Sequence, residues 1–245
     1  MKRLILSLLV VTGASAHAQS NFDKQLPEKP VYTADLVDST YGITLYEPLN
    51  MALAGDSVRM VNGYAAQNWI EDYYEDGALL HKGYYIDGQL KVYKNYYPDG
   101  TVERNFVNVD GYRSKVTLYY PNGNIKSQVT YSEGAALVWT DYFMNGNIEY
   151  YEEYNKNLMW HIAKRSYYES GQAQSLFELT DKKKLNYTQN DFYSTGKKKM
   201  AGTLRYDKDA YDYFKTGKWL YFSEGGSPIK EEEYQDGKLL KTNKL

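Results

Sequence analysis

The sequence predicts an all-β fold: an elongated, twisted antiparallel β-meander of tandem hairpin repeats, each about 23 residues long, in a single layer. Three observations lead to this prediction. Pairs of adjacent aromatic residues followed by a glycine recur through most of the chain. Between these glycines, apolar and polar residues alternate with the two-residue period of a strand. Asp-Gly and Asn-Gly pairs, which tolerate positive φ and match the twist of paired strands, stand at many of the expected turns.

The glycines that follow the aromatic pairs define the repeat. Their spacings are 23, 23, 23, 25, 25 and 29 residues, and they are Gly77, Gly100, Gly123, Gly146, Gly171, Gly196 and Gly225. Tandem duplication with small insertions produces such a register. A second glycine follows 11 residues later in several units, at Gly88, Gly111 and Gly134. Each unit is therefore expected to hold two strands and two turns, which gives some fourteen strands. Around 146–196 the half-way glycine is missing, and Asn157 and Lys182 occupy the corresponding places.

The central unit shows the strand pattern most clearly. One strand is expected before the turn Pro121-Asn122-Gly123 and another after it. The residues expected to share one face are Val116, Leu118 and Tyr120, then Ile125, Val129 and Tyr131; Lys126, Gln128 and Thr130 alternate with the second group. This alternation predicts a β-hairpin with one buried face.

The paired aromatic rings are expected to supply the core of a sheet that no helix covers. An aromatic platform for sugar rings or peptides would use the same chemistry, and the sequence leaves both readings open. The residues selected for binding are Tyr96, Tyr119 and Tyr142, because they share one register and each precedes a ring expected to be buried.

The N-terminus predicts export. Lys2 and Arg3 precede a short apolar run from Leu4 to Thr12, and Ala16-His17-Ala18 resembles a cleavage site, so residues 1–18 are expected to be a signal peptide. The apolar run is too short for a membrane helix, and no transmembrane segment is expected after cleavage. Residues 19–62 are expected to form a leader and a cap, and residues 63–245 the β-repeat domain. The expected location is the periplasm, the outer surface or the exterior of a bacterium.

Composition excludes several classes of function. The chain has 29 Lys and Arg against 31 Asp and Glu, a net charge of -2, which gives no basic bias toward nucleic acid. A mean hydropathy of -0.67 excludes a multi-span membrane protein. The absence of cysteine excludes disulfides, thiolate metal sites and cysteine nucleophiles.

No motif for catalysis, cofactor binding or metal binding is found. The two histidines beyond the signal, His81 and His161, are too far apart for a shared metal site and are expected to be exposed or half-buried strand residues. In the acidic runs Glu152-Glu153 and Glu231-Glu232-Glu233, adjacent residues should point to opposite faces of the sheet. These carboxylates are therefore expected to be ordinary solvated surface groups. Solvated loops best explain the basic runs Lys182-Lys183-Lys184 and Lys197-Lys198-Lys199. A solvated tail is the simpler explanation for the C-terminal Lys238, Lys241 and Lys244, although their charge could instead protect a sheet edge.

The segment from Thr216 to Gly225, with Gly217-Lys218-Trp219 followed by Tyr221-Phe222, resembles the MORN repeat (membrane occupation and recognition nexus), in the bacterial variant grouped with YwqK-like antitoxins. The resemblance covers about residues 63–245. It implies a repeat sheet that binds or scaffolds, and it brings no catalytic residues.

These observations predict a non-enzymatic exported protein whose surface binds an envelope protein or a surface glycan, without a cofactor. Two alternatives remain open: a carboxylate-type glycan hydrolase, which needs two carboxyl groups across a cleft, and a self-assembling structural protein of the cell envelope. The sequence gives no oligomeric state.

Overall fold

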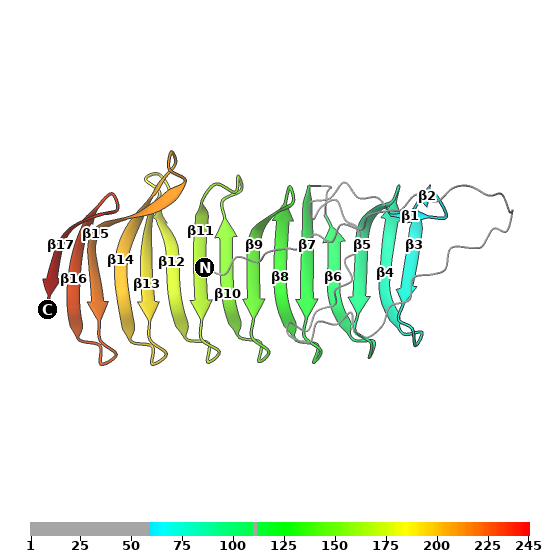
Figure 1. Cartoon of the computed structure of the whole chain (residues 1–245), viewed down its shortest axis with the longest axis horizontal. Helices are drawn as coiled ribbons and strands as arrows, with labels where there is room; N and C mark the ends of the chain where they lie inside the picture. Colours follow the sequence, from blue (N-terminus) through cyan, green and yellow to red (C-terminus); the bar gives the residue numbers. More distant parts are fainter. Residues whose placement is uncertain (1–58, 110–111) are drawn as a thin grey trace, which may run out of the picture. The chain divides into compact units, whose positions relative to one another are not determined.

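The computed structural model describes residues 59–109 and 112–245. Their regular structure is entirely β, and fifteen strands form one open antiparallel sheet in chain order (Figure 1). A further two-stranded sheet precedes it. The all-β meander is thus confirmed, with one strand more in the main sheet than the fourteen expected. The expected signal peptide and most of the expected leader and cap lie outside the described residues.

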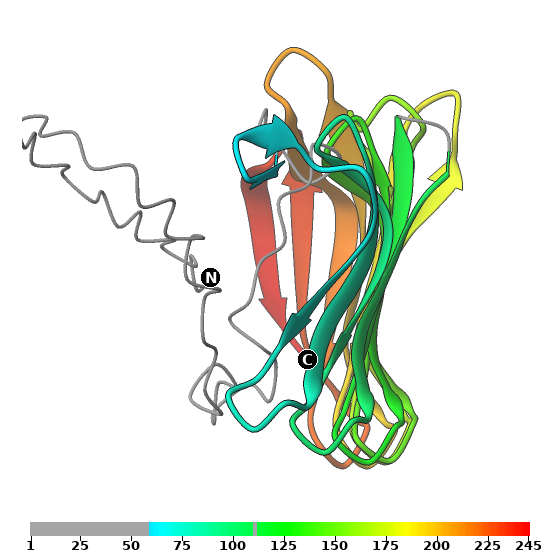
Figure 2. The ribbon, with the colours of Figure 1, turned by 90° about the vertical axis from the view of Figure 1, so that its right-hand side faces the viewer.

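The strands are seven to eleven residues long apart from β1, β2 and β3; β1 pairs with β2, and from β3 onward each strand pairs with the next along the chain. They are β1 (Met60–Val61), β2 (Tyr64–Ala65), β3 (Asn68–Tyr73), β4 (Leu79–Ile86), β5 (Gln89–Tyr96), β6 (Val102–Asn108), β7 (Arg113–Tyr119), β8 (Ile125–Ser132), β9 (Ala135–Tyr142), β10 (Ile148–Tyr154), β11 (His161–Tyr167), β12 (Ala173–Asp181), β13 (Asn186–Phe192), β14 (Lys198–Asp207), β15 (Asp212–Phe222), β16 (Pro228–Gln235) and β17 (Lys238–Lys244). Seen along the row of strands, the sheet is bowed rather than flat (Figure 2).

The turns at one end of the strands share one geometry. In the turn after β5, the amide of Tyr97 donates to the carbonyl of Thr101 at 2.8 Å, and the amide of Gly100 donates back to the carbonyl of Tyr97 at 2.9 Å. Gly100 has a φ of 84°, which a residue with a side chain rarely adopts. The carboxylate of Asp99 accepts the amide of Thr101 at 2.9 Å. The Asp-Gly pair is therefore explained by an acceptor and a left-handed residue in adjacent positions.

The last of these turns corrects the repeat register. The glycine with positive φ is Gly226, at 93°, and its amide donates to the carbonyl of Ser223. Gly225, which the sequence pattern selects, lies one residue earlier and is not left-handed. Ser223 therefore takes the place of the second aromatic residue, and the pair Tyr221-Phe222 lies wholly within β15. The error arose because two consecutive glycines occur in this turn.

The half-way turns of the later units use other left-handed residues in place of glycine. These are Leu158, Leu185 and Tyr211, each with a φ between 53° and 58°, and neither Asn157 nor Lys182 has a positive φ. The sheet nevertheless continues through this region without a break.

The second aromatic residue of each pair joins neighbouring repeats. Five tyrosine hydroxyls, those of Tyr74, Tyr97, Tyr120, Tyr168 and Tyr193, each donate at 2.7–2.9 Å to a backbone carbonyl of the next repeat. The acceptor is the first aromatic residue of the next pair in the first four cases and Phe222, the second residue of its pair, in the case of Tyr193. Phe143 lacks the hydroxyl, and the side-chain amides of Asn145 and Asn147 donate to the carbonyl of Glu169 there instead. The expectation that the pairs form the core is corrected: Tyr74 and Tyr97 are buried, but the buried clusters consist of other residues.

Two separate clusters of buried apolar residues lie along the sheet. The first combines Ala66, which follows β2, with five residues of β4–β7: Tyr85, Leu90, Tyr93, Phe106 and Val116. The second, in β12–β14, contains Phe177, Leu185, Tyr187 and Tyr206. The C-terminal lysines belong to the last strand, β17, at a sheet edge, so they are not a solvated tail.

Candidate functional site

One face of the sheet, which we call the pocket face, carries the candidate site. Its residues follow from the cross-strand register: Glu152 of β10 pairs with Lys164 of β11, Lys164 with Phe177 of β12, and Phe177 with Gln189 of β13. A second row of cross-strand neighbours lies two residues along each strand, closer to the turns that contain the aromatic pairs. Its members are Tyr150, Ser166, Ser175 and Asp191. Side chains two residues apart share a face, so both rows point the same way.

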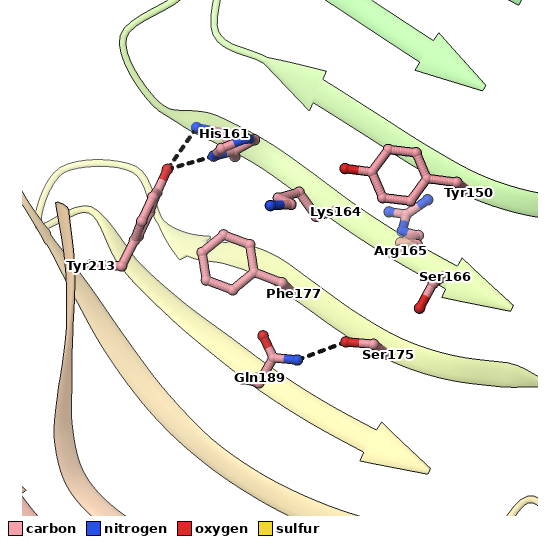
Figure 3. Close-up of a pocket in the computed structure, with 9 residues that line it drawn as sticks. All are labelled: Tyr150, His161, Lys164, Arg165, Ser166, Ser175, Phe177, Gln189 and Tyr213. Atoms are coloured by element: carbon pink, nitrogen blue, oxygen red, sulfur yellow. Dashed lines mark hydrogen bonds between the residues drawn. The ribbon is translucent and has the colours of Figure 1, made fainter. Parts of the chain in front are cut away.

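A pocket with a volume of about 270 Å³ lies over these rows (Figure 3). It combines aromatic rings with polar side chains, and it is lined by Tyr150, His161, Lys164, Arg165, Ser166, Ser175, Phe177, Gln189 and Tyr213. A second hollow of about 420 Å³ shares Tyr150 and Ser166 with the first among its lining residues. Its other lining residues are Phe143, Glu149, Tyr167, Tyr168, Glu169 and Gln174.

Phe177 and its neighbours form the apolar wall. The Phe177 ring stacks on Tyr187, with centroids 4.7 Å apart, and meets Tyr213 edge-on at 5.0 Å. Tyr187 is fully buried, and its hydroxyl donates to the carbonyl of His161 at 2.9 Å. The rings are therefore fixed by packing and hydrogen bonds before any ligand arrives.

His161 is held from two sides. Its Nε2 lies 2.6 Å from Oε1 of Glu152, and its Nδ1 lies 2.8 Å from the hydroxyl of Tyr213, which also accepts the backbone amide of His161 at 2.9 Å. Burial alone raises the pKa of Glu152, but hydrogen bonds from His161 and Tyr150 outweigh it and leave this pKa below its ordinary value. Glu152 is thus a charged carboxylate with hydrogen-bond partners in the protein, and not one that only contacts solvent. Glu153 lies on the opposite face and accepts a hydrogen bond from the hydroxyl of Tyr151.

A second polar group forms the floor. Gln189 Nε2 donates to Ser175 Oγ at 2.7 Å and to Asp191 Oδ1 at 2.5 Å, and Ser175 Oγ donates to Asp191 at 2.8 Å. These contacts use the amide hydrogens of Gln189 and leave its carbonyl oxygen facing no protein donor among the described residues.

Lys164 and Ser166 differ from the other polar residues of the pocket. Within the described part of the chain, neither side chain makes a hydrogen bond or ion pair. Arg165 projects to the opposite face, where its guanidinium pairs with Glu178 at 2.8 Å and lies 5.1 Å from the Tyr151 ring centroid. The pocket thus offers one unpaired ammonium, one hydroxyl and one amide carbonyl beside aromatic rings.

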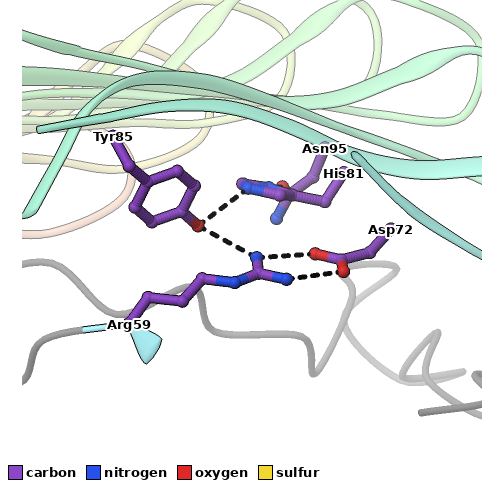
Figure 4. A network of polar contacts seen from close by, with 5 residues as sticks. All are labelled: Arg59, Asp72, His81, Tyr85 and Asn95. Atoms are coloured by element: carbon purple, nitrogen blue, oxygen red, sulfur yellow. Dashed lines mark hydrogen bonds and ion pairs between the residues drawn. The ribbon is translucent and has the colours of Figure 1, made fainter. Parts of the chain in front are cut away.

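The other histidine is placed differently from expectation. His81 is completely buried, with Nδ1 2.8 Å from Asn95 Oδ1 and Nε2 3.1 Å from the Tyr85 hydroxyl (Figure 4). Arg59 joins the same network through Tyr85 and a two-pronged ion pair with Asp72, at 2.6 and 2.7 Å. His161, by contrast, is half-buried, as expected.

The aromatic residues selected from the sequence lie on the face opposite the pocket. Tyr96, Tyr119 and Tyr142 each follow a residue that is in register with the pocket face, and all three are half-buried. They share one face, but nothing brings them into the pocket. The residues that line the pocket were not selected from the sequence. The one feature of the sequence that sets their units apart is the loss of the half-way glycine.

Among residues 59–109 and 112–245, no cluster of three or more potential metal ligands occurs. The same residues include no helix that is long and apolar enough to cross a membrane.

Comparison with known proteins identifies one repeat. Residues 115–133 match the family described as MORN repeat variant, and the match covers most of the β7–β8 hairpin. No curated protein matches the chain significantly. The match and the fifteen-stranded repeat sheet together support a MORN-type repeat protein and fit a repeat protein that binds or scaffolds.

Proposed function

We propose that this chain is an exported, non-enzymatic binding protein that holds a glycan of the cell envelope in the pocket over β10–β13. The observation that carries the proposal is the pocket itself, in which preformed aromatic rings stand beside polar groups without protein partners. A sugar ring has apolar C–H faces that pack on aromatic rings and hydroxyls that need donors and acceptors. The N-terminal sequence, which resembles a signal peptide, supports export to where such glycans occur.

The dimensions of the site favour a glycan over a protein partner. A stable protein interface buries about 800 Å² on each partner around an apolar centre. Here the aromatic surface is confined to a pocket of about 270 Å³, with polar groups directly beside the rings. The adjoining hollow extends the site in one direction, as a second sugar unit would require.

The binding test compares two tyrosine truncations on opposite faces. The protein is titrated calorimetrically with a panel of neutral and acidic trisaccharides. Tyr150→Ala removes a pocket wall and should weaken binding by about tenfold or more, whereas Tyr119→Ala, on the opposite face, should leave it unchanged. Circular dichroism and unfolding midpoints confirm that both variants fold.

Three results would reject the proposal: no trisaccharide binds, Tyr119→Ala is the damaging change, or the trisaccharide is cleaved during the titration. The last outcome would revive the hydrolase alternative. Export is tested separately by sequencing the N-terminus of protein recovered outside the cytoplasm, where Gln19 should be the first residue.

A further inference from the structure

The Lys164 ammonium is the feature of the pocket best suited to bind an anionic ligand. It projects between the Tyr150 and Phe177 side chains (Figure 3). Among the described residues it has no hydrogen-bond or ion-pair partner, although the ammonium can donate three hydrogen bonds. The Lys164 side chain is half-buried, so water can solvate its ammonium in the free protein, and a ligand carboxylate can replace this water with charge-assisted hydrogen bonds.

The acidic residues near Lys164 are already engaged. Glu152, its cross-strand neighbour, lies 2.6 Å from His161, and Asp191 accepts hydrogen bonds from Gln189 and Ser175. Each carboxylate therefore has its own hydrogen-bond donors, and the charge of Lys164 also contributes to lowering the pKa of Glu152. Lys164 remains as the positive group that faces the pocket, because Arg165 is paired with Glu178 on the opposite face.

We propose, on the basis of the glycan-binding function above, that the sugar bound in this pocket is acidic and that its carboxylate pairs with Lys164. The Ser166 hydroxyl and the Gln189 carbonyl oxygen lie in the same pocket and can bond the hydroxyls of the same sugar. The sugar ring then packs on the aromatic wall formed by Phe177 and Tyr150.

The charge balance favours a carboxylate over a phosphate or sulfate. Among the described residues that line the pocket, Lys164 carries the one ammonium without a hydrogen-bond or ion-pair partner; Glu152 lies across from it on β10, and Asp191 lies two strands away on β13. A singly charged planar group is neutralised by one lysine, whereas a doubly charged phosphate would leave excess negative charge beside two carboxylates.

The test uses two probes that differ only at the acid group. Trigalacturonic acid and its trimethyl ester have the same rings and hydroxyls, but only the acid is charged. The wild-type protein should bind the acid about tenfold or more tightly than the ester. Lys164→Gln should remove this preference by weakening binding of the acid, while binding of the ester changes little.

Lys183→Gln is the matched control. Lys183 is an exposed lysine in the turn between β12 and β13, so this variant loses the same charge outside the pocket and should keep the full preference for the acid. Equal binding of acid and ester by the wild type would overturn the inference while leaving glycan binding intact. Binding of neither probe, together with no binding of neutral trisaccharides, would reject the proposed function itself. An equal loss in both lysine variants would show a general effect of surface charge and would also overturn the inference.

Discussion

At the scale of single residues, Gly202 shows how a missing side chain shapes the pocket face. A Cβ atom at this position would lie 2.2 Å from the ring of Trp219, whose indole N–H donates to the carbonyl of Thr203 at 3.1 Å. The Trp219 side chain is 1% exposed, and the ammonium of Lys215 lies 4.2 Å from its ring centroid. The tryptophan therefore lies flat over the glycine, and the backbone of β14 provides its support.

Gly202→Ala should destabilise the protein by about 1–3 kcal/mol, because the new methyl group must displace a tightly packed ring. Denaturant unfolding measures the change. Gly225→Ala is the control: its Cβ would meet only the Ser223 hydroxyl, at 3.6 Å, and its backbone does not require glycine. Equal stability of the two variants would show that Trp219 can move away at no cost.

His81 gives the protein a defined response to acid. Burial lowers the pKa of this ring to about 4, although Asn95 and the charge of Asp72 act in the opposite direction. In the unfolded chain the pKa is about 6.5, so unfolding takes up a proton between these values. The contribution of His81 to stability is therefore complete above pH 6.5 and is lost progressively as the pH falls toward 4.

The prediction is that the free energy of unfolding falls between pH 6.5 and 4.5 by up to about 1.4 kcal/mol per pH unit from this group. His81→Gln retains hydrogen-bonding groups but does not titrate, so its stability should depend less on pH in this range. Urea unfolding at several pH values compares the slopes. Parallel curves for the two proteins would mean that His81 is not the group responsible.

At the scale of the repeat, the tyrosine at the start of most of these turns also links its turn to the next one through its hydroxyl. Tyr168 illustrates this: its hydroxyl donates to the carbonyl of Phe192, 24 residues away, at 2.9 Å. The contact links one hairpin to the next at the end of the strands, where the backbone ladder has stopped. Such bonds explain why the second aromatic residue of the pair is usually tyrosine.

Tyr168→Phe should cost about 1 kcal/mol, because it removes one intramolecular hydrogen bond and leaves a carbonyl without its donor. Tyr167→Phe, one residue earlier, removes a hydroxyl that makes no hydrogen bond with the described residues and should be neutral. Thermal unfolding compares the pair. A larger loss from Tyr167→Phe would contradict the proposed role of the inter-repeat bond.

The contrast between Gly100 and Lys164 shows how far the sequence leads. A turn needs a left-handed residue and a local acceptor, so the two adjacent residues Asp99 and Gly100 are enough to predict the turn from the sequence. The strand order follows from such turns, because each hairpin pairs neighbours. The pocket depends instead on which residues meet across β10–β13, and a bulge between Glu153 and Tyr154 changes that register. No local pattern reveals that Lys164 lacks a partner, since its partners would come from other strands.

At the scale of the whole sheet, stability is concentrated in two places. The first buried cluster centres on Phe106 and the second on Phe177. From Ile125 to Tyr154 only Ser127 and Val129 are buried. Each strand contacts mainly its two neighbours, so stabilisation passes along the sheet step by step rather than through one common core. The two clusters should therefore open independently.

Hydrogen exchange followed by mass spectrometry tests this independence. Phe177→Ala leaves a cavity in the second cluster, at a cost of about 3–5 kcal/mol, and should accelerate exchange across β11–β15 while β4–β6 stay protected. Phe106→Ala should produce the reverse pattern. If either substitution accelerates exchange equally in both regions, the sheet unfolds as one cooperative unit. Independent opening would instead place the pocket in the second stability unit, so that a ligand bound there protects β11–β13 and leaves the first cluster unaffected.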